Sequence, residues 1–493
     1  MESTASRRQA LLAPALIFTG MALAVISSLG APLVPRIADA YQVSVSDAQW
    51  SLTVTLLVGA VSTPVLGRLG DGPHRRAVTL ASMAVVLAGA VLAALPLGFG
   101  FLIAGRALQG VGAGLVSLAI TTARDALPRE RSRPALAVLS ITTAAGVGLG
   151  YPLTGLIAQG SGIHAAFWFG AAVSALTLAV AVLVLPSSAH LPRRPLDTTG
   201  VLLLAAPVTG LLLALGEGGG WGWASARTLA LLGGSLVLLA GWAVHELRTE
   251  HPLVDLRLLR NRSVLAADLV VLVAGVGMYL LMSMVTRFAQ TPAAAGYGFG
   301  ASVAVTGLVL VPFSLAGVAA GKLAPRLTRR LPVRLVLGLG CGVSLMSMLS
   351  FGLVHGSLGY LFLAMGISGL GIGTVLAVMP ALVVQAVPAH ETGSAISFNQ
   401  LLRCIGYAAG SALSAAVLQA HTAPGRTLPS ADGYRTGALL GCAVWVIAIV
   451  MAALLPRRRN HDGPAPAAEE EPTTRETTRD RRGPAAVPAR RTP

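Results

Sequence analysis

Charge is what this sequence lacks most. Only 11% of its 493 residues are charged and 54% are apolar, with a mean hydropathy of +0.73. A soluble globular protein carries roughly 25% charged residues, so this chain has too few polar side chains to cover a surface exposed to water. An ordinary cytosolic enzyme is therefore excluded, and the long apolar runs predict an all-α polytopic membrane protein.

Cysteine and aromatic residues are also scarce. The three cysteines, Cys341, Cys404 and Cys442, lie in apolar runs without metal-ligand spacing, so we expect no disulfide and no bound metal. Aromatic residues make up only 5% of the chain, which is unlike an aromatic-rich β-barrel. The chain has no G-x-x-x-x-G-K-S/T loop, which excludes a P-loop ATP-driven pump, and no cofactor is expected.

Long apolar runs dominate what remains. A helix needs about 20 apolar residues to cross the hydrocarbon, because backbone groups in lipid are satisfied only within the helix. Fourteen transmembrane helices are predicted on this basis. They span Leu11–Pro35, Trp50–Leu69, Val78–Leu97, Phe101–Thr122, Ala135–Ala158, His164–Pro186, Thr199–Leu215, Thr228–Val244, Val264–Val285, Ala301–Leu323, Val333–Leu353, Leu358–Val378, Gly393–Leu418 and Gly437–Leu455.

The basic residues alternate with these spans. If residues 1–10 are cytoplasmic, 29 of the 36 basic residues fall in inner segments and five in outer ones, while Arg106 and Arg403 lie within spans. This skew follows the positive-inside rule and predicts a plasma or inner membrane protein with both termini cytoplasmic. It also accounts for the net charge of +16 without a nucleic-acid partner. Residues 456–493 mix Arg, Glu, Pro and Thr and are expected to form a disordered cytoplasmic tail.

The first span has an alternative interpretation as a signal peptide. Arg7 and Arg8 precede it, and Ala38-Asp39-Ala40 follows it like a cleavage site. Its apolar run of about 25 residues is longer than the roughly 7–15 of a signal core, so we expect a retained helix.

An internal repeat divides the chain. Gly67–Arg76 is repeated as Gly321–Arg330 at an offset of 254, and Gly110–Gly114 as Gly369–Gly373 at an offset of 259. Pro128 then matches Pro388 at an offset of 260. The repeats predict two pseudo-symmetric six-helix bundles, 11–186 and 263–455, and a linker, 187–262, that contains two inserted transmembrane helices.

The first copy of the repeated loop resembles the G-x-L-a-D-R-x-G-R-R signature of the major facilitator superfamily. The matching residues are Gly67, Leu69, Asp71, Arg75 and Arg76, while Gly72 and His74 depart from the pattern. Gly67 allows helices to approach closely, and we expect Asp71 to cap the third span and to pair with an Arg of the opposite half. The resemblance implies a conformational latch on the cytoplasmic side; the alternative is that these charges only set the topology.

The fourth span resembles the superfamily's R-x-x-Q-G-x-G motif through Arg106, Gln109 and the glycines that follow. Arg106 lies about five residues, roughly 7–8 Å, inside the outer end of its helix. A charge at that depth needs a cavity or a partner, or its side chain must reach back to the membrane surface. The resemblance implies a role for Arg106 and Gln109 in proton coupling.

The fifth span resembles the antiporter signature G-x-x-x-G-P-x-x-G-G of this superfamily. Gly146, Gly150, Pro152 and Gly155 carry the resemblance, although Pro152 is displaced by one residue and Thr154 replaces a glycine. The glycines form a smooth face and Pro152 bends the helix. The resemblance implies export, and plain helix packing is the alternative.

The whole region Leu11–Leu455 looks like the fourteen-helix drug:proton antiporter branch, with one departure. That branch typically carries an acid in helix 1 about nine residues before a proline, and this position is Ile26. Asp268 in the ninth span is therefore a candidate proton carrier, although it could instead pair with Arg262 or with a neighbouring loop arginine. Arg403, deep in the thirteenth span, could bind an anionic group or a carboxylate.

These features predict a secondary active transporter that exports hydrophobic or amphiphilic organic compounds, as in drug or antibiotic efflux, in exchange for protons. Its partners would be the small-molecule substrate, protons and the lipid bilayer, and we expect a monomer. Alternatives within the superfamily are a coupled or uncoupled metabolite transporter and a non-transporting membrane protein. A membrane-embedded enzyme would need clustered acids or histidines, whereas the nine histidines are scattered.

Overall fold

The computed structural model describes residues 2–29, 33–43, 45–186, 195–353, 356–388, 391–423 and 428–455. Its helices in the first part of the chain are α1 (Glu2–Ser28), α2 (Val34–Tyr41), α3 (Val45–Gly70), α4 (Arg75–Ala94), α5 (Phe99–Gly110), α6 (Gly112–Ala126) and α7 (Arg129–Val184). The next are α8 (Thr198–Trp221), α9 (Ala226–Arg248) and the 3-10 helix η2 (Leu256–Arg260). The remainder are α10 (Arg262–Gln290), the 3-10 helix η3 (Ala293–Ala295), α11 (Val303–Val309), α12 (Val311–Arg330), α13 (Val333–Leu353), α14 (Leu358–Ala386), α15 (Thr392–Ala420) and α16 (Ala431–Ala453).

Short polar side chains begin several of these helices. Asp197 accepts a hydrogen bond from the Gly200 amide at the start of α8, and Ser225 and Asn261 start α9 and α10 in the same way. Each satisfies one of the amides that a first helical turn leaves without a partner. The start of α15 is different, because Glu391 at its N-cap position gives no side-chain capping bond.

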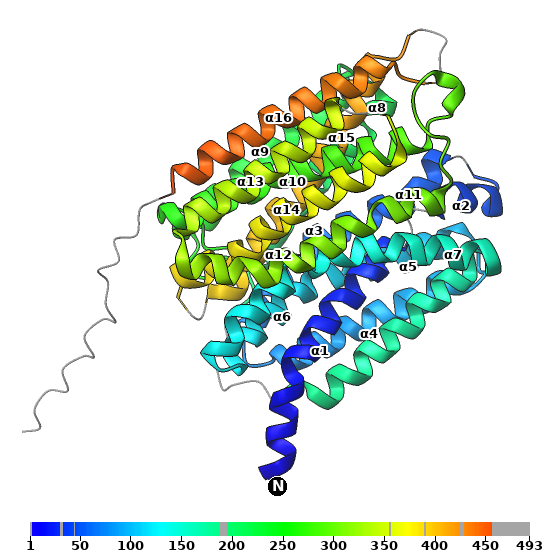
Figure 1. The fold of residues 1–493 in the computed structure, drawn as a ribbon. Helices are drawn as coiled ribbons and strands as arrows, with labels where there is room; N and C mark the ends of the chain where they lie inside the picture. Colours follow the sequence, from blue (N-terminus) through cyan, green and yellow to red (C-terminus); the bar gives the residue numbers. More distant parts are fainter. Residues whose placement is uncertain are drawn as a thin grey trace, which may run out of the picture. The chain divides into compact units, whose positions relative to one another are not determined.

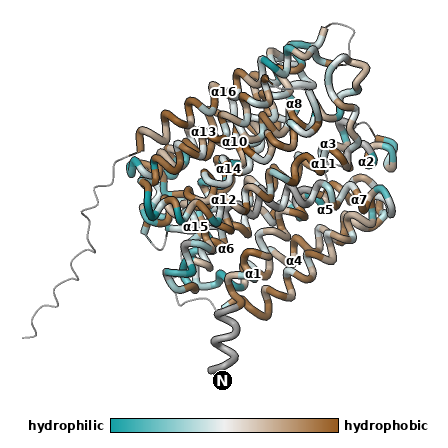
Figure 2. The backbone as a smooth tube through the Cα atoms, viewed as in Figure 1, coloured by the Kyte–Doolittle hydropathy of each residue, from teal (hydrophilic) through white to brown (hydrophobic). Residues whose placement is uncertain are grey.

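The prediction of an all-helical, multi-pass membrane protein is confirmed. Within the described residues, twelve helical segments are long and apolar enough to cross a membrane. Figure 2 shows apolar residues along the helices and polar ones gathered near helix ends. The predicted total of fourteen is not reached, because α1 contributes a shorter apolar stretch, Leu11–Ile26, and α7 is counted as one segment, Pro152–Val184.

One predicted boundary was wrong, and another matches a break in a long helix. The first span was expected to continue to Pro35, but α1 ends at Ser28 and Pro35 lies in the first turn of the separate helix α2, where a proline needs no amide partner. The fifth and sixth spans were expected as separate helices. They follow one another within α7, and the backbone leaves helical geometry between them at Gly162, with φ 83° and ψ 176°, as expected for two helices joined at a kink.

The helices pack in two groups that meet at two related crossings. Figure 1 shows the helices of residues 11–186, hereafter the first half, in blue to cyan, and those of residues 263–455, the second half, in green through yellow to orange. Helix α3 packs on α15, and its repeat counterpart α12 packs on α7. The contacts between the halves thus follow the sequence repeat.

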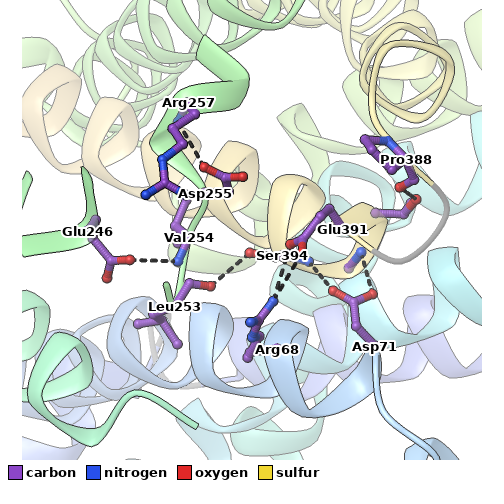
Figure 3. A network of polar contacts seen from close by, with 12 residues as sticks. Arg68, Asp71, Glu246, Leu253, Val254, Asp255, Arg257, Pro388, Glu391 and Ser394 are labelled. Atoms are coloured by element: carbon purple, nitrogen blue, oxygen red, sulfur yellow. Dashed lines mark hydrogen bonds and ion pairs between the residues drawn. The ribbon is translucent and has the colours of Figure 1, made fainter. Parts of the chain in front are cut away.

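One end of the bundle contains the loop after α3 and the start of α15. We call it the arginine-rich end, because Arg68 and Arg75 flank the loop after α3 and Arg257 lies near the start of α15 (Figure 3). Residues 187–194 of the predicted linker and the predicted tail, 456–493, lie outside the described residues.

Candidate functional site

The crossing of α3 with α15 brings two glycines together. A Cβ atom at Gly67 would lie 2.0 Å from the Ser397 hydroxyl oxygen and 2.7 Å from the Gly393 carbonyl oxygen. A Cβ at Gly393 would in turn lie 2.8 Å from the Gly67 carbonyl oxygen. Real Cβ atoms do not approach other atoms so closely, so only glycine permits this contact between the halves.

Asp71, directly after α3, caps a helix of the opposite half. Its Oδ1 accepts a hydrogen bond from the Gly393 amide at 2.8 Å, and its Oδ2 accepts one from the Ser394 amide at 2.9 Å. Both amides belong to the first turn of α15, where the helix dipole also favours negative charge. The expectation that Asp71 caps the third span was wrong: α4 begins at Arg75, and its N-cap residue is His74, which makes no side-chain capping bond. The expected Arg partner for Asp71 is replaced by main-chain amides.

The environment of Asp71 changes its proton affinity. The side chain is only 4% exposed, and this burial raises the pKa of its carboxyl group from 3.8 to about 7. The two amide hydrogen bonds and the charge of Arg75 act in the opposite direction, whereas the Glu391 carboxylate raises the pKa further. Asp71 therefore titrates close to neutral pH when α3 and α15 are in contact.

A second contact between the halves lies beside Asp71. Arg68, near the end of α3, places its Nη1 3.2 Å from Oε2 of Glu391, and both residues are buried. Figure 3 shows this pair next to the Asp71 cap, with Arg68 and Asp71 directed at the same end of α15. Breaking a buried ion pair costs free energy if either charge stays buried without its partner, so this pair stabilises the contact of α3 with α15.

Arg75 and Arg76, also expected in the latch, bind within the first half. Arg75 Nη1 lies 2.7 Å from Asp125 Oδ2, and Arg75 Nε donates to the Gly70 carbonyl. Arg76 donates to the Val182 carbonyl at 2.9 Å. The structure thus separates the four predicted latch residues: Gly67 and Asp71 contact the opposite half, and the two arginines brace the loop that presents them.

Arg106 in α5 joins three helices. Its Nε donates to the Ser51 carbonyl of α3 at 3.0 Å, and its Nη1 donates to the Ile26 carbonyl of α1 at 3.2 Å and to Gln109 Oε1 at 2.6 Å. The side chain is fully buried, so it does not reach the surface of the bundle. At the position where the resembling branch carries an acid, this chain offers Arg106 a main-chain carbonyl.

The predicted antiporter motif on α7 packs on both halves. A Cβ at Gly146 would lie 2.2 Å from the Ala24 Cβ, so this glycine allows α7 to contact α1. Gly155 faces Ala304, 3.7 Å from the position of a Cβ, in the second half. Pro152 lies inside the helix, and Thr154 donates its hydroxyl to the Gly150 carbonyl at 2.6 Å, both of which favour a bend.

Asp268 in α10 is held by an amide and not by an arginine. It is 2% exposed, and Asn399 of α15 donates its Nδ2 to Asp268 Oδ1 at 2.7 Å. Asp268 has no ion pair among the described residues, so the alternative pairing with Arg262 was wrong. The closest described partner of this carboxyl group is a neutral side chain.

Asn399 also borders a small cavity between the halves. Arg403 and Gln400 line it from α15, Met379 from α14, and Ile120 from α6 in the first half. Its free volume is about 10 Å³, which is room for about one water molecule. Arg403 is buried there, with its guanidinium carbon 5.9 Å from the Tyr407 ring centre. Of the four residues expected in proton coupling, Arg106 and Gln109 lie together, whereas Asp268 and Arg403 are brought to the same region by Asn399.

Sequence reasoning missed Glu391, Ser394 and Asn399. The repeat aligns Glu391 with Arg131 at the offset of 260, so the two halves carry opposite charges at this position and symmetry could not reveal it. Glu391-Thr392-Gly393-Ser394 directly before an apolar run does have the composition of a helix start, and that signal could have located the cap.

Comparison with known proteins gives one consistent result. The family model described as Major Facilitator Superfamily matches residues 15–411 and 269–490. A protein of Mycobacterium tuberculosis named multidrug resistance protein Stp is 28% identical over 418 residues, which cover 82% of this chain and 75% of that protein. The tetracenomycin C resistance and export protein of Streptomyces glaucescens is 26% identical over 409 residues, which cover 80% and 73%.

A solved structure supports the same fold. The human organic anion transporter MFSD10 (TETRAN) superposes with a TM-score of 0.63 at 16% identity, covering 90% of this chain and 99% of that chain. With the two halves and their paired crossings, these matches show that the chain belongs to the major facilitator superfamily and is a multi-pass membrane transporter, not an enzyme.

Proposed function

We propose that this protein is a secondary active exporter of hydrophobic or amphiphilic organic compounds, which it exchanges for protons by alternating access. The observation that carries the proposal is the polar contact between Asp71 and the first turn of α15. It joins the two halves at one end through hydrogen bonds, which can break and form again as that end opens and closes. The names of the relatives in Mycobacterium and Streptomyces support drug or antibiotic efflux as the direction and substrate class.

We further propose fourteen crossings with both termini cytoplasmic. Helix α7 has 56 residues, about 84 Å at 1.5 Å per residue, which is enough for two crossings separated at Gly162. The apolar stretch Leu11–Ile26 of α1 supplies the remaining crossing. The excess of arginine then makes the arginine-rich end cytoplasmic. We expect a monomer, since one chain supplies both halves of the crossings.

In this orientation the structure corresponds to the state closed to the cytoplasm. The cavity beside Asn399 holds about one water molecule, whereas drug-sized ligands occupy pockets of roughly 300–1,000 Å³. Separation of α3 from α15 would widen this region toward the cytoplasm, and substrate would enter between the halves. The contacts of Gly67, Asp71 and Arg68 would form again when the substrate is released on the other side.

Asp268 is the residue we propose as the proton carrier. As a carboxylate it accepts a hydrogen bond from the Asn399 amide nitrogen, so the amide oxygen is left for other donors. A protonated Asp268 would donate to the amide oxygen instead, and the amide nitrogen would then face other groups. Because Asn399 borders the cavity, proton binding would change the polarity that the cavity wall presents to a substrate.

Arg106 and Gln109 have a different part in this proposal. Arg106 keeps its charge at all physiological pH values and its partners include the carbonyls of Ile26 and Ser51. It would hold α1 and α3 in register during the movement of the first half, with Gln109 fixing its guanidinium. We assign no proton to helix 1, where Ile26 stands.

The experiment uses inverted membrane vesicles that contain the protein, with a fluorescent lipophilic dye added to the outer solution. A pH gradient, acidic inside, should drive dye uptake, and a protonophore should abolish it. Asp268→Asn should lose gradient-driven accumulation while dye still equilibrates, whereas Asp432→Asn, an exposed acid, should behave as the parent protein. Uptake that ignores the protonophore would contradict proton coupling and favour an uncoupled transporter of the same superfamily.

A further inference from the structure

The two inserted helices lie against the crossing of α3 with α15. Helix α8 packs on both α3 and α15, and α9 packs on α8. One buried apolar cluster joins them: Ala60 of α3, Leu204, Val208 and Leu212 of α8, Trp242 of α9, Leu253 and Val254 of the following loop, and Leu401 of α15. The inserted pair therefore touches both halves where they meet.

The loop after α9 folds back from the arginine-rich end into this cluster. Leu253 and Val254 are 0% and 3% exposed, although they belong to a connection between helices. Glu246, in the last turn of α9 and fully buried, accepts a hydrogen bond from the Val254 amide through Oε2 at 3.2 Å. Gly200 of α8 leaves the space for this carboxylate, since a Cβ there would lie 2.8 Å from Glu246 Oε1.

The same loop reaches the cap of α15. Ser394 donates its hydroxyl to the Leu253 carbonyl at 2.8 Å while its amide donates to Asp71 at 2.9 Å. Figure 3 shows the continuous line of contacts from Glu246 through Val254 and Leu253 to Ser394 and Asp71. One residue of α15 is thus bound by the first half and by the inserted pair at once.

A buried carboxylate costs free energy unless it is compensated, so its presence calls for a structural reason. Arg257 ties the far side of this loop to the end of α9 by donating to the Leu247 and Thr249 carbonyls. Leu253 and Val254 have no polar side chains, so the Glu246 carboxylate is what holds the Val254 main chain. Without the Glu246 acceptor, the buried Val254 amide would be left without that bond, and the Leu253 carbonyl would lose its fixed position under Ser394.

We propose that Glu246 and the Leu253–Val254 segment are positioning elements of the latch: the inserted helix pair holds the first turn of α15 where Asp71 can cap it. This inference rests on the proposed function in one respect: it takes the opening of the arginine-rich end to be a step of transport. The inserted helices are then part of the machinery that sets how readily the arginine-rich end opens.

The test measures opening directly. Nitroxide labels are placed at Glu130→Cys and Pro332→Cys, exposed positions on the two halves at this end, in a variant whose three native cysteines are replaced by alanine. Electron–electron resonance distances in the purified full-length protein then give the ratio of open to closed molecules. Glu246→Ala and Ser394→Ala should each raise that ratio by about five- to tenfold, the effect of losing one hydrogen bond of this kind.

Two further variants separate the hydrogen bond from other effects. Glu246→Gln keeps an acceptor of the same length and should stay near the parent ratio, and Glu250→Ala, an exposed acid on the same connection, should not change it. If Glu246 acts through Ser394, the double variant Glu246→Ala/Ser394→Ala should open no more than the stronger single variant.

The inference is overturned if Asp71→Ala opens this end while Glu246→Ala and Ser394→Ala leave the distances unchanged. It is also overturned if Glu246→Gln opens the protein as much as Glu246→Ala, or if the two single effects multiply in the double variant. Ser394→Ala removes only a hydroxyl, so it remains informative if Glu246→Ala fails to fold. Because no substrate is needed, a protein that fails to export dye but still opens in these variants would contradict the proposed function and leave this inference standing.

Discussion

Acidification should close the arginine-rich end, and the residue responsible should be Asp71. In the closed structure its carboxyl group has a pKa of about 7, raised chiefly by burial. When α3 and α15 separate, the side chain enters water and its pKa should return to about 3.8. The closed state therefore binds a proton that the open state releases over this interval.

The sign and size follow from linkage. A group whose pKa is raised in one state favours that state at low pH, and the advantage is lost as the pH rises through the higher pKa. The extra stability of the closed state is complete below pH 3.8 and absent well above pH 7. Between pH 8 and pH 6 the ratio of closed to open molecules should therefore rise about tenfold, and by about tenfold more at pH 5.

The assay is the distance between the nitroxide labels at positions 130 and 332, recorded from pH 8 to pH 5. The labels are attached before the pH is changed, so thiol reactivity does not enter the result. Asp71→Asn cannot titrate and should flatten the profile, whereas the exposed Asp432→Asn should leave it unchanged. Opening on acidification, or a parent-like profile in Asp71→Asn, would refute the burial argument.

Three other outcomes follow from the same contacts. Gly67→Ala should push α3 from α15 and favour the open state by about 1–3 kcal/mol, as overpacking does, which the same label distances would report. Arg68→Gln leaves Glu391 buried without its cation and should lower the stability of the closed state by about 3–5 kcal/mol. A lower thermal unfolding temperature would report this loss, and the double variant Arg68→Gln/Glu391→Gln should recover part of it. Gly146→Val should separate α7 from α1 and abolish dye uptake.

The two glycine predictions have glycine controls, and the double variant above is the control for Arg68→Gln. Gly338→Ala on α13 adds a methyl group where no other atom lies within 4 Å, and it should leave the label distances unchanged. Gly155→Ala faces Ala304 at ordinary contact distance and should transport dye like the parent protein. A shift in Gly338→Ala equal to that of Gly67→Ala would mean that glycine loss acts through the helix backbone and not through the crossing.

The sequence by itself determined that this protein lies in a lipid bilayer and in which order its helices follow one another. Apolar runs of membrane length must be helical because lipid offers no hydrogen bonds to the backbone, so the order of the helices can be read from the chain, although twelve and not fourteen segments of this length are found among the described residues. The repeat of Gly67–Arg76 at Gly321–Arg330 likewise predicted that α3 and α12 are counterparts, and each does cross a helix of the opposite half. Composition alone excluded soluble enzymes.

Only the tertiary structure decided which charges meet. Asp71 lies only four residues before Arg75 in the sequence, yet Arg75 pairs with Asp125, and Asp71 reaches the first turn of α15 more than 300 residues away. The motif Gly67–Arg76, which predicted the latch, gives no sign of Glu391 or Glu246. Their contacts depend on distances of about 3 Å between atoms, and spacing along the chain does not set such distances. The lipid bilayer requires long apolar helices. Which helices and charges meet depends on close approach, such as that of α3 and α15 at Gly67 and Gly393.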